Sequence, residues 1–382
     1  MLNNVRLIDS EVPVNITIQG DIITGLINRS PTKKEKLELN FEGALVFPGL
    51  INSHDHLDFN LFPQLGDKKY NNYTEWGKYI HQHYKREIAE VLKVPVGLRE
   101  EWGILKNLLC GVTTVVNHGE KIKIRNPLIN VHEKYYCLHS AGFENNWRLK
   151  LNHPSKWQFP FVIHTGEGTD DYAGREIDRL IRWNLLRRKL IGVHGVAMQQ
   201  KQAKNFKALV WCPQSNDFLL GKTATVNELK DYTTILFGTD STLTGSWNIW
   251  EHIRQARRSG LLSDTELYKS LTISAAGIWN TNNGEIAEGK KVDLVVVKPQ
   301  KGKHNADGFF SAGPADILLV ISNGQIKLFD KILYYQLAKM DTSVFRPVNI
   351  DGVCKYVAGN LPKLVKDIKQ YYSGASFPVT TD

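Results

Sequence analysis

Four short apolar runs in this chain each lead to side chains that can bind a metal ion. These side chains are His54 with His56, His164, His194 and Asp240. Side chains alternate along a strand, so His54 and His56 point to the same side of theirs. Four apolar runs that end in this way predict a parallel barrel, because the chemistry of such barrels sits at the carboxyl ends of the strands.

The residue types at these strand ends are those that a transition metal prefers. Neutral imidazoles together with one carboxylate suit zinc or iron, and they leave a position open for water. A single H-x-H pair is weak evidence, because one buried histidine and one loop histidine fit it equally well. The recurrence of the pattern at further strand ends favours one shared site.

Seven motifs follow one another along the chain in a specific order and spacing. They are PGLINSHDHL at 48–57, GVTTVV at 111–116, HTGEG at 164–168, VHGVAM at 193–198, WCPQSND at 211–217, FGTDS at 237–241 and GEIAEGKKVDLVVV at 284–297. In this order the sequence resembles the amidohydrolase superfamily. Within it, the sequence is most similar to the branch of cytosine, guanine and adenosylhomocysteine deaminases and triazine hydrolases. The resemblance covers most of the chain.

The expected fold class is α/β, with a (β/α)8 TIM-like barrel and a small β-sandwich domain built from both termini. Short strand patterns in residues 5–27 return at 292–321, and the resemblance implies the same split domain. We expect the small domain at 1–48 and 285–335, the barrel at 49–284, and a C-terminal extension at 336–382 whose helix packs on the barrel. The barrel wall is expected to be irregular around 121–158, where residues 147–151 are a candidate strand.

The resemblance implies one divalent metal per chain. In the family, the residues that match His54, His56, His164 and Asp240 hold it. Zinc is the expected metal and iron is the alternative. Some amidohydrolases carry a carboxylated lysine that bridges two metals, but Lys150 is the only plausible position here and its surroundings do not match.

Glu167 is the candidate proton shuttle. It lies just past the predicted strand, three residues beyond His164, and Gly166 allows the backbone to turn sharply there. A carboxylate that faces the open metal position can take a proton from water and pass it to a leaving group. The alternative for Glu167 is a loop carboxylate that caps the next helix.

His194 and Asp240 complete the candidate catalytic set. The resemblance implies that His194 polarises the hydroxide or the substrate; a metal ligand or a core histidine are the alternatives. One oxygen of Asp240 can bind the metal while the other accepts a proton. The alternative for Asp240 is a helix N-cap, since Asp-Ser-Thr precedes a predicted helix.

Three further residues are candidates for substrate binding. His118 and His139 fall near predicted strand ends and could contact the substrate, although such histidines are often structural. Trp76 is an aromatic neighbour of the motifs and could stack on a planar heterocycle, with core packing as the alternative.

The composition is ordinary for a soluble globular protein of 382 residues. The net charge of +9 comes from lysines and arginines that are spread along the chain, which favours a solvated basic surface. We therefore expect no nucleic acid and no membrane as partners, and a homodimer is possible. The four cysteines form no C-x-x-C pair, so we expect reduced thiols in a cytoplasm.

These features predict hydrolytic deamination of a small amino-substituted heterocycle. One alternative is hydrolysis of a cyclic amide or of a halogenated ring at the same metal site. A more remote alternative is an inactive barrel that serves as a binding protein. The substrate cannot be named from the sequence, because it depends on loops that match no member of the branch closely enough.

Overall fold

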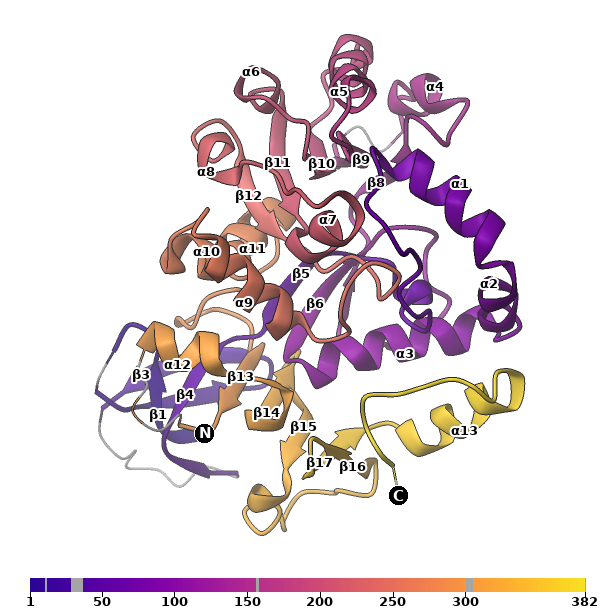
Figure 1. Ribbon diagram of the computed structural model, residues 1–382. Helices are drawn as coiled ribbons and strands as arrows, with labels where there is room; N and C mark the ends of the chain where they lie inside the picture. The colour runs from indigo at the N-terminus through magenta and orange to yellow at the C-terminus, as the bar shows by residue number, and fades with distance from the viewer. Residues whose placement is uncertain (11, 29–36, 156–157, 300–301, 303–304, 382) are drawn as a thin grey trace.

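The computed structural model describes residues 1–10, 12–28, 37–155, 158–299, 302 and 305–381 of a mixed α/β protein. In the described residues of the central part of the chain, eight strands form two parallel sheets, most of which can be followed in Figure 1. One sheet has the order β5-β6-β7, with β5 at Leu50–Asp55, β6 at Val112–Asn117 and β7 at Asn130–His132. The other has the order β12-β11-β10-β9-β8, with β8 at Tyr136–Ser140, β9 at Phe161–Thr165, β10 at Leu190–His194, β11 at Phe206–Trp211 and β12 at Thr234–Phe237.

The two parallel sheets meet where β5 and β12 end. The backbone N–H groups of Thr239 and Asp240 both donate to the carbonyl of His54, at 3.1 Å each. This contact brings the first and the last of the eight strands side by side at their carboxyl ends. Between β7 and β8 no ladder pairs the strands within the described residues, so complete barrel closure stays a prediction.

Helices follow most of these strands and surround the two sheets (Figure 1). After β5 come the 3₁₀ turn η1 at Leu57–Phe59 and the helices α1 at Tyr73–His83, α2 at Lys85–Leu92 and α3 at Val96–Leu109. Later helices are α4 at Trp147–Leu151, α5 at Asp171–Trp183, α6 at Gln200–Ala203, α7 at Pro213–Leu220, α8 at Val226–Leu229, α9 at Ile249–Ser259, α10 at Asp264–Ser270 and α11 at Ile273–Trp279. None of the helices in the described ranges has both the length and the apolar character that crossing a membrane requires.

The prediction of a strand at residues 147–151 is wrong, because these residues form helix α4. The sequence Trp-Arg-Leu-Lys-Leu alternates as a strand would, but Trp147 and Leu151 are also one helical turn apart. Both of these side chains are buried, whereas Leu149 is 74% exposed. The helical spacing therefore matches the burial.

The two ends of the chain share one nine-stranded sheet with the order β16-β17-β15-β14-β13-β4-β1-β2-β3. Its N-terminal strands are β1 at Leu2–Leu7, β2 at Val14–Gln19, β3 at Ile22–Ile27 and β4 at Leu39–Pro48. Its C-terminal strands are β13 at Leu294–Val297, β14 at Ile317–Ser322, β15 at Gln325–Asp330, β16 at Phe345–Ile350 and β17 at Val353–Ala358. The two groups meet where β4 pairs antiparallel with β13. A sandwich of two packed sheets and the domain boundaries stay predictions.

Residues 345–358, which the sequence assigns to a C-terminal extension, thus extend this sheet as β16 and β17. Helix α12, at Asn305–Ser311, lies between β13 and β14 in the sequence. Helix α13, at Leu361–Tyr371, packs against α3. Figure 1 shows α13 and α3 side by side.

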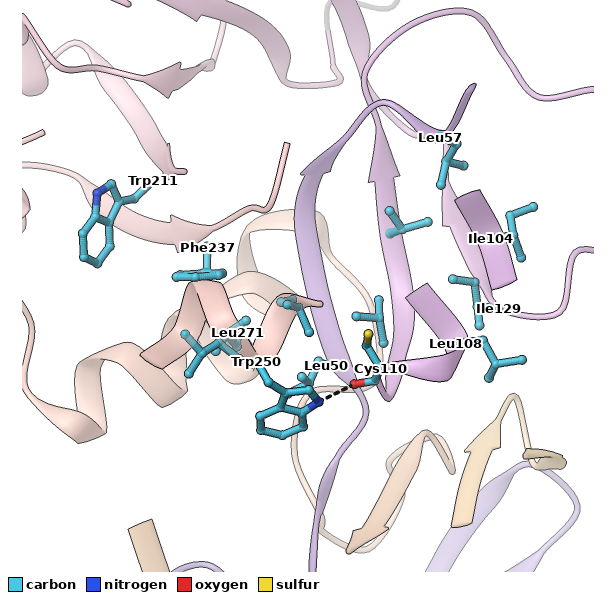
Figure 2. Close-up of a cluster of buried hydrophobic side chains, with 14 of the residues drawn as sticks. Leu50, Leu57, Ile104, Leu108, Cys110, Ile129, Trp211, Phe237, Trp250 and Leu271 are labelled. Atoms are coloured by element: carbon cyan, nitrogen blue, oxygen red, sulfur yellow. Dashed lines mark hydrogen bonds between the residues drawn. The ribbon is translucent and has the colours of Figure 1, made fainter. Parts of the chain in front are cut away.

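A large apolar core packs α3 and α9 against the strands. Figure 2 shows this cluster, with Leu50 from β5, Leu108 from α3 and Phe237 from β12 among its labelled side chains. Trp250 of α9 is fully buried, and its indole N–H donates to the carbonyl of Cys110 at 3.0 Å. The strands that carry the candidate ligands are therefore packed on this core.

His252 of α9 is a buried ionisable group outside the candidate site. Its Nε2 lies 2.8 Å from the carbonyl oxygen of Ser246, so Nε2–H is the donor. Burial lowers the pKa of His252 to about 4, which means that the folded chain keeps this imidazole neutral.

We expect His252 to destabilise the fold as pH falls from about 6.5 to 4. In this range the unfolded chain takes up a proton that folded His252 does not, so the free energy of unfolding decreases by up to about 1.4 kcal/mol per pH unit. Chemical unfolding at a series of pH values should show a shallower slope for His252→Gln, and the exposed His81→Gln serves as control. Equal slopes for the wild type and His252→Gln would contradict this.

Candidate metal centre and active site

The candidate ligands come from the carboxyl ends of parallel strands, as the sequence predicts. His54 lies near the end of β5 and His56 just after it. His164 lies near the end of β9, His194 is the last residue of β10, and Asp240 follows β12. All five side chains are buried, and each comes from the rim where the strands end.

The potential donor atoms of these residues lie close together. The Nε2 atoms of His54 and His164 are 3.2 Å apart. Nε2 of His54 and Nε2 of His56 each lie 3.7 Å from Oδ1 of Asp240. Possible ligand atoms of His54, His56 and His164 lie within 4.8 Å of one another, and so do those of His54, His194 and Asp240.

The charge state of the imidazoles also fits a metal site. Burial, with the neighbouring His54, lowers the pKa of His56, and burial lowers the pKa of His164 well below its ordinary value. Neutral imidazoles are the form that binds a metal. Two buried imidazole nitrogens that face each other also need a shared cation or a proton between them. The set therefore fits a divalent metal such as zinc.

Asp240 is held in a fixed orientation. The hydroxyls of Ser215 and Thr244 donate to its Oδ2 at 2.8 and 3.0 Å, and the backbone N–H of Ser241 donates to Oδ1 at 2.9 Å. Oδ1 is thereby left facing the imidazoles. The N-cap alternative is not supported, because α9 is capped by the side chain of Asn248.

Two residues of the site have backbone conformations that residues other than glycine rarely adopt. The φ angle is 72° at His194 and 59° at Asp240. Such conformations cost free energy and persist only where the surrounding structure enforces them, which is most frequent at functional sites. They turn both side chains at the points where β10 and β12 end.

Glu167 lies beside two of the histidines and is buried. Its Oε2 is 3.8 Å from Nδ1 of His164 and 3.6 Å from Nε2 of His194. Burial raises the pKa of the Glu167 carboxyl well above its ordinary value, and the carboxylates of Asp240 and Glu176 add to this. A carboxyl with a raised pKa binds a proton more readily than an ordinary carboxyl, which is a property of groups that transfer protons.

The turn that presents Glu167 requires glycine. Gly166 has a φ of 61°, and a Cβ at this position would lie 2.6 Å from Cδ1 of Ile177. The backbone N–H of Tyr73, at the start of α1, donates to the carbonyl of Glu167 at 3.0 Å. The segment after β9 is therefore fixed by close packing against Ile177 and by the hydrogen bond from Tyr73.

His194 has one ring nitrogen engaged and one directed toward the site. Its Nδ1 lies 2.9 Å from Oδ1 of Asn216, so Nδ1 carries the proton and Nε2 is the acceptor. Nε2 is buried and has no hydrogen-bond partner among the described residues. Burial lowers the pKa of His194 to about 4. In this state His194 can accept a hydrogen bond from a water molecule.

His118 and His139 join the same group of rings. The centroid of the His118 ring lies 4.3 Å from that of His164 and 5.0 Å from that of His54, and His139 lies 4.7 Å from His164. Both nitrogens of His118 are buried without a hydrogen-bond partner in the described part of the chain. Both rings therefore lie beside the candidate ligands His54 and His164.

Trp76 is the substrate-binding candidate that the structure does not bring into this group. Its indole N–H donates to the carbonyl of Leu65 at 2.7 Å, and its ring packs against the apolar core. Lys150 lies on α4, where its ammonium group pairs with Glu144. It therefore does not stand at a strand end as a bridging ligand would.

The sequence reasoning missed the side chains that orient these groups. Ser215 and Asn216 lie in the motif at 211–217, which contributes to the resemblance, but no role follows from it. Of the partners of Asp55 described below, Asn52 lies in the motif at 48–57, whereas Asn60, Lys106 and Asn107 lie in none of the motifs, and neither does Thr244.

Four candidate ligands, a buried carboxyl and a strand-end arrangement define a class: a hydrolase with a divalent metal site in an α/β fold. Residues 150–327 match the model of the amidohydrolase family. This match covers slightly less than half of the chain and confirms its resemblance to the amidohydrolases.

Similar proteins agree with this class. The chain is 24% identical over 359 residues to the 5-methylthioadenosine/S-adenosylhomocysteine deaminase of Pyrococcus furiosus, covering 75% of this chain and 84% of that protein. An adenosine deaminase from Xanthomonas campestris with bound zinc has a TM-score of 0.71 at 18% identity, with 97% of each chain covered. The atrazine chlorohydrolase TrzN from Arthrobacter aurescens, complexed with zinc, has a TM-score of 0.66 at 17% identity, with 85% and 94% covered. These likenesses show a common fold.

Proposed function

We propose that this protein catalyses the hydrolytic deamination of an amino-substituted heterocycle. The observation that carries the proposal is Glu167, a buried carboxyl of raised pKa that lies within 4 Å of ring nitrogens of both His164 and His194. A leaving amine needs a proton, whereas a leaving halide does not, so this group favours deamination over dehalogenation. The expected scaffold is the (β/α)8 barrel.

In this proposal His54, His56, His164 and Asp240 hold one zinc ion. When bound, such an ion lowers the pKa of water and so supplies a nucleophile at neutral pH. Neutral His194 accepts a hydrogen bond from the attacking water at Nε2 and so orients it. Asp240 keeps its position because Ser215 and Thr244 hold its other oxygen.

Glu167 moves the protons of the reaction. It takes one proton from the water as the oxygen adds to the ring carbon that bears the amine, and it delivers this proton to the adjacent ring nitrogen. A second proton from the added hydroxyl then passes to the amine through the same carboxylate. Ammonia leaves, and the ring carbon becomes a carbonyl. His118 and His139 are placed to contact the ring.

The purified protein is expected to contain about one zinc per chain, because the proposed ligands His54, His56, His164 and Asp240 lie beside one another and Lys150 lies elsewhere. Elemental analysis after dialysis measures this directly. Two tightly held metals per chain would contradict the mononuclear site.

A substrate screen tests the reaction class. Zinc-loaded protein is incubated with aminated purines and their nucleosides, pyrimidines, pterins and triazines, and ammonia is measured. Methylthioadenosine and adenosylhomocysteine come first, because a relative of this chain is named for them. Chlorinated triazines with chloride as readout, and cyclic amides, test the alternatives. Hydrolysis of these compounds without any ammonia release would overturn the proposal.

A further inference from the structure

A buried polar cluster surrounds Asp55, the residue between the ligands His54 and His56. The Asp55 cluster consists of Asn52, Asp55, Asn60, Lys106, Asn107 and Thr239. All six residues are buried. Because Asp55 follows His54 on the strand, its side chain points away from the metal-facing imidazoles, toward α3.

Both carboxylate oxygens of Asp55 accept hydrogen bonds. Oδ1 accepts from the amide of Asn60 at 2.7 Å. Oδ2 accepts from the amide of Asn107 at 2.8 Å, from Nζ of Lys106 at 3.1 Å and from the amide of Asn52 at 3.3 Å. The side chains of Lys106 and Asp55 are only 2% and 0% exposed. Such a pair is tolerated only with further hydrogen bonds, and Lys106 also donates to Oδ1 of Asn60 at 2.8 Å.

The cluster is bonded to the backbone on both sides of the metal site. The amide of Asn60 donates to the carbonyl of His56 at 3.1 Å. The side-chain oxygen Oδ1 of Asn52 accepts from the backbone N–H of Thr239 at 3.1 Å, and the side-chain amide of Asn52 donates to the Thr239 hydroxyl at 2.8 Å. That hydroxyl donates to the carbonyl of Asp240 at 2.9 Å. The cluster therefore spans from one ligand strand to the other.

Helix α3 supplies Lys106 and Asn107 and lies directly against the loop after β5. A Cβ at Gly103 would lie 2.2 Å from the carbonyl oxygen of Leu57, so only glycine allows this approach. Helix α3 packs against β6, and Figure 1 shows the two elements next to each other. Helix α3 thus places the ammonium group of Lys106 and the side-chain amide of Asn107 against Asp55, the residue between His54 and His56.

We propose that Asp55 and Lys106 are positioning residues of the metal centre, which fix the distance between the β5 ligands and Asp240 before the metal binds. The inference rests on the metal site of the proposed function and does not depend on the reaction that takes place there. Ligands that are already in place bind a metal more tightly, because less ordering accompanies binding. Losing an outer hydrogen-bond partner of a metal ligand typically weakens metal binding by about 10- to 100-fold.

Lys106→Met tests this proposal without any substrate. We expect the zinc dissociation constant, measured by competition with a chelator, to rise by about 10- to 100-fold. The visible absorption bands of the cobalt-substituted protein should also shift, because the ligand geometry changes. The matched control is Lys355→Met. Lys355 pairs with Asp330 at 2.7 Å, and both side chains are buried in the nine-stranded sheet, which contributes none of the candidate ligands.

Lys355→Met should lower the stability to unfolding but leave the zinc dissociation constant and the cobalt spectrum unchanged. If Lys106→Met does the same, the Asp55 cluster is purely structural and the proposal is wrong. Should Lys106→Met fail to fold, Asn60→Ser retains both charges and removes the amide that joins Asp55 to His56. Asn60→Ser is then expected to weaken zinc binding, and wild-type affinity would overturn the proposal.

The two proposals fail in different ways. A wild-type protein that binds zinc but releases no ammonia from any aminated ring refutes deamination and leaves the positioning role intact. Unchanged zinc binding in the variants refutes the positioning role, while ammonia release by the wild type remains as evidence for deamination.

Discussion

Glu167→Gln is expected to lower turnover by about two to four powers of ten while zinc content stays the same. Glutamine has the size and shape of glutamate but cannot carry the proton that the leaving amine needs. The measurement is kcat for ammonia release from the best substrate of the screen, together with zinc content. Glu228→Gln, an exposed position on α8, is the control. Full activity of Glu167→Gln would place the proton path through another group, with His194 or His118 the next to test.

Asp240→Asn is expected to weaken zinc retention by about 100-fold or more. Oδ1 of Asp240 faces the Nε2 atoms of His54 and His56, and a neutral amide is a poorer ligand than a carboxylate. Because this side chain is itself a candidate ligand, the loss should exceed that of an outer partner. Chelator competition measures it, and the exposed Asp231→Asn is the control.

The two variants together test the assignment of roles. If Glu167→Gln lost its zinc while Asp240→Asn retained it, Glu167 would be the metal ligand and Asp240 the proton shuttle, the reverse of the proposed roles. Comparable zinc loss in both would make Glu167 a ligand as well. Only the pattern of zinc retained by Glu167→Gln and lost by Asp240→Asn agrees with the proposed mechanism.

The strand-end positions were predictable from the sequence because they depend on local patterns. An apolar run and the residue after it define where a strand ends, so His164, His194 and Asp240 could be placed on one rim. Glu167 was predictable for the same reason, since its relation to His164 is a matter of three residues and one glycine. The structure brings all four together.

The side chains that orient the site were not predictable, because their partners are distant in the sequence. Lys106 and Asp55 are 51 residues apart, and Asn52 and Thr239 are 187 apart. No periodicity or spacing encodes such a contact. The hydrogen bond of Trp76 was not predictable for a related reason. Its nearness to a motif in the sequence says nothing of the Leu65 carbonyl that binds its indole.

The 147–151 segment shows the limit of pattern reading over short lengths. Five residues that alternate apolar and polar fit a strand and one turn of helix equally well. The buried pair Trp147 and Leu151 decides between them, and this burial depends on neighbours that the segment itself does not reveal.

The pairing of β4 with β13 has a consequence for the order in which the chain folds during synthesis. β4 leads through Gly49 into β5 and the His54–His56 pair, yet one of its edges is covered only when residues 294–297 have been made. Until then β4 of the nascent chain has an unpaired edge, and such an edge can pair with a strand of another molecule. Chains that end before Leu294 should therefore aggregate. The strand that leads to His54 and His56 is paired on both edges only late in translation.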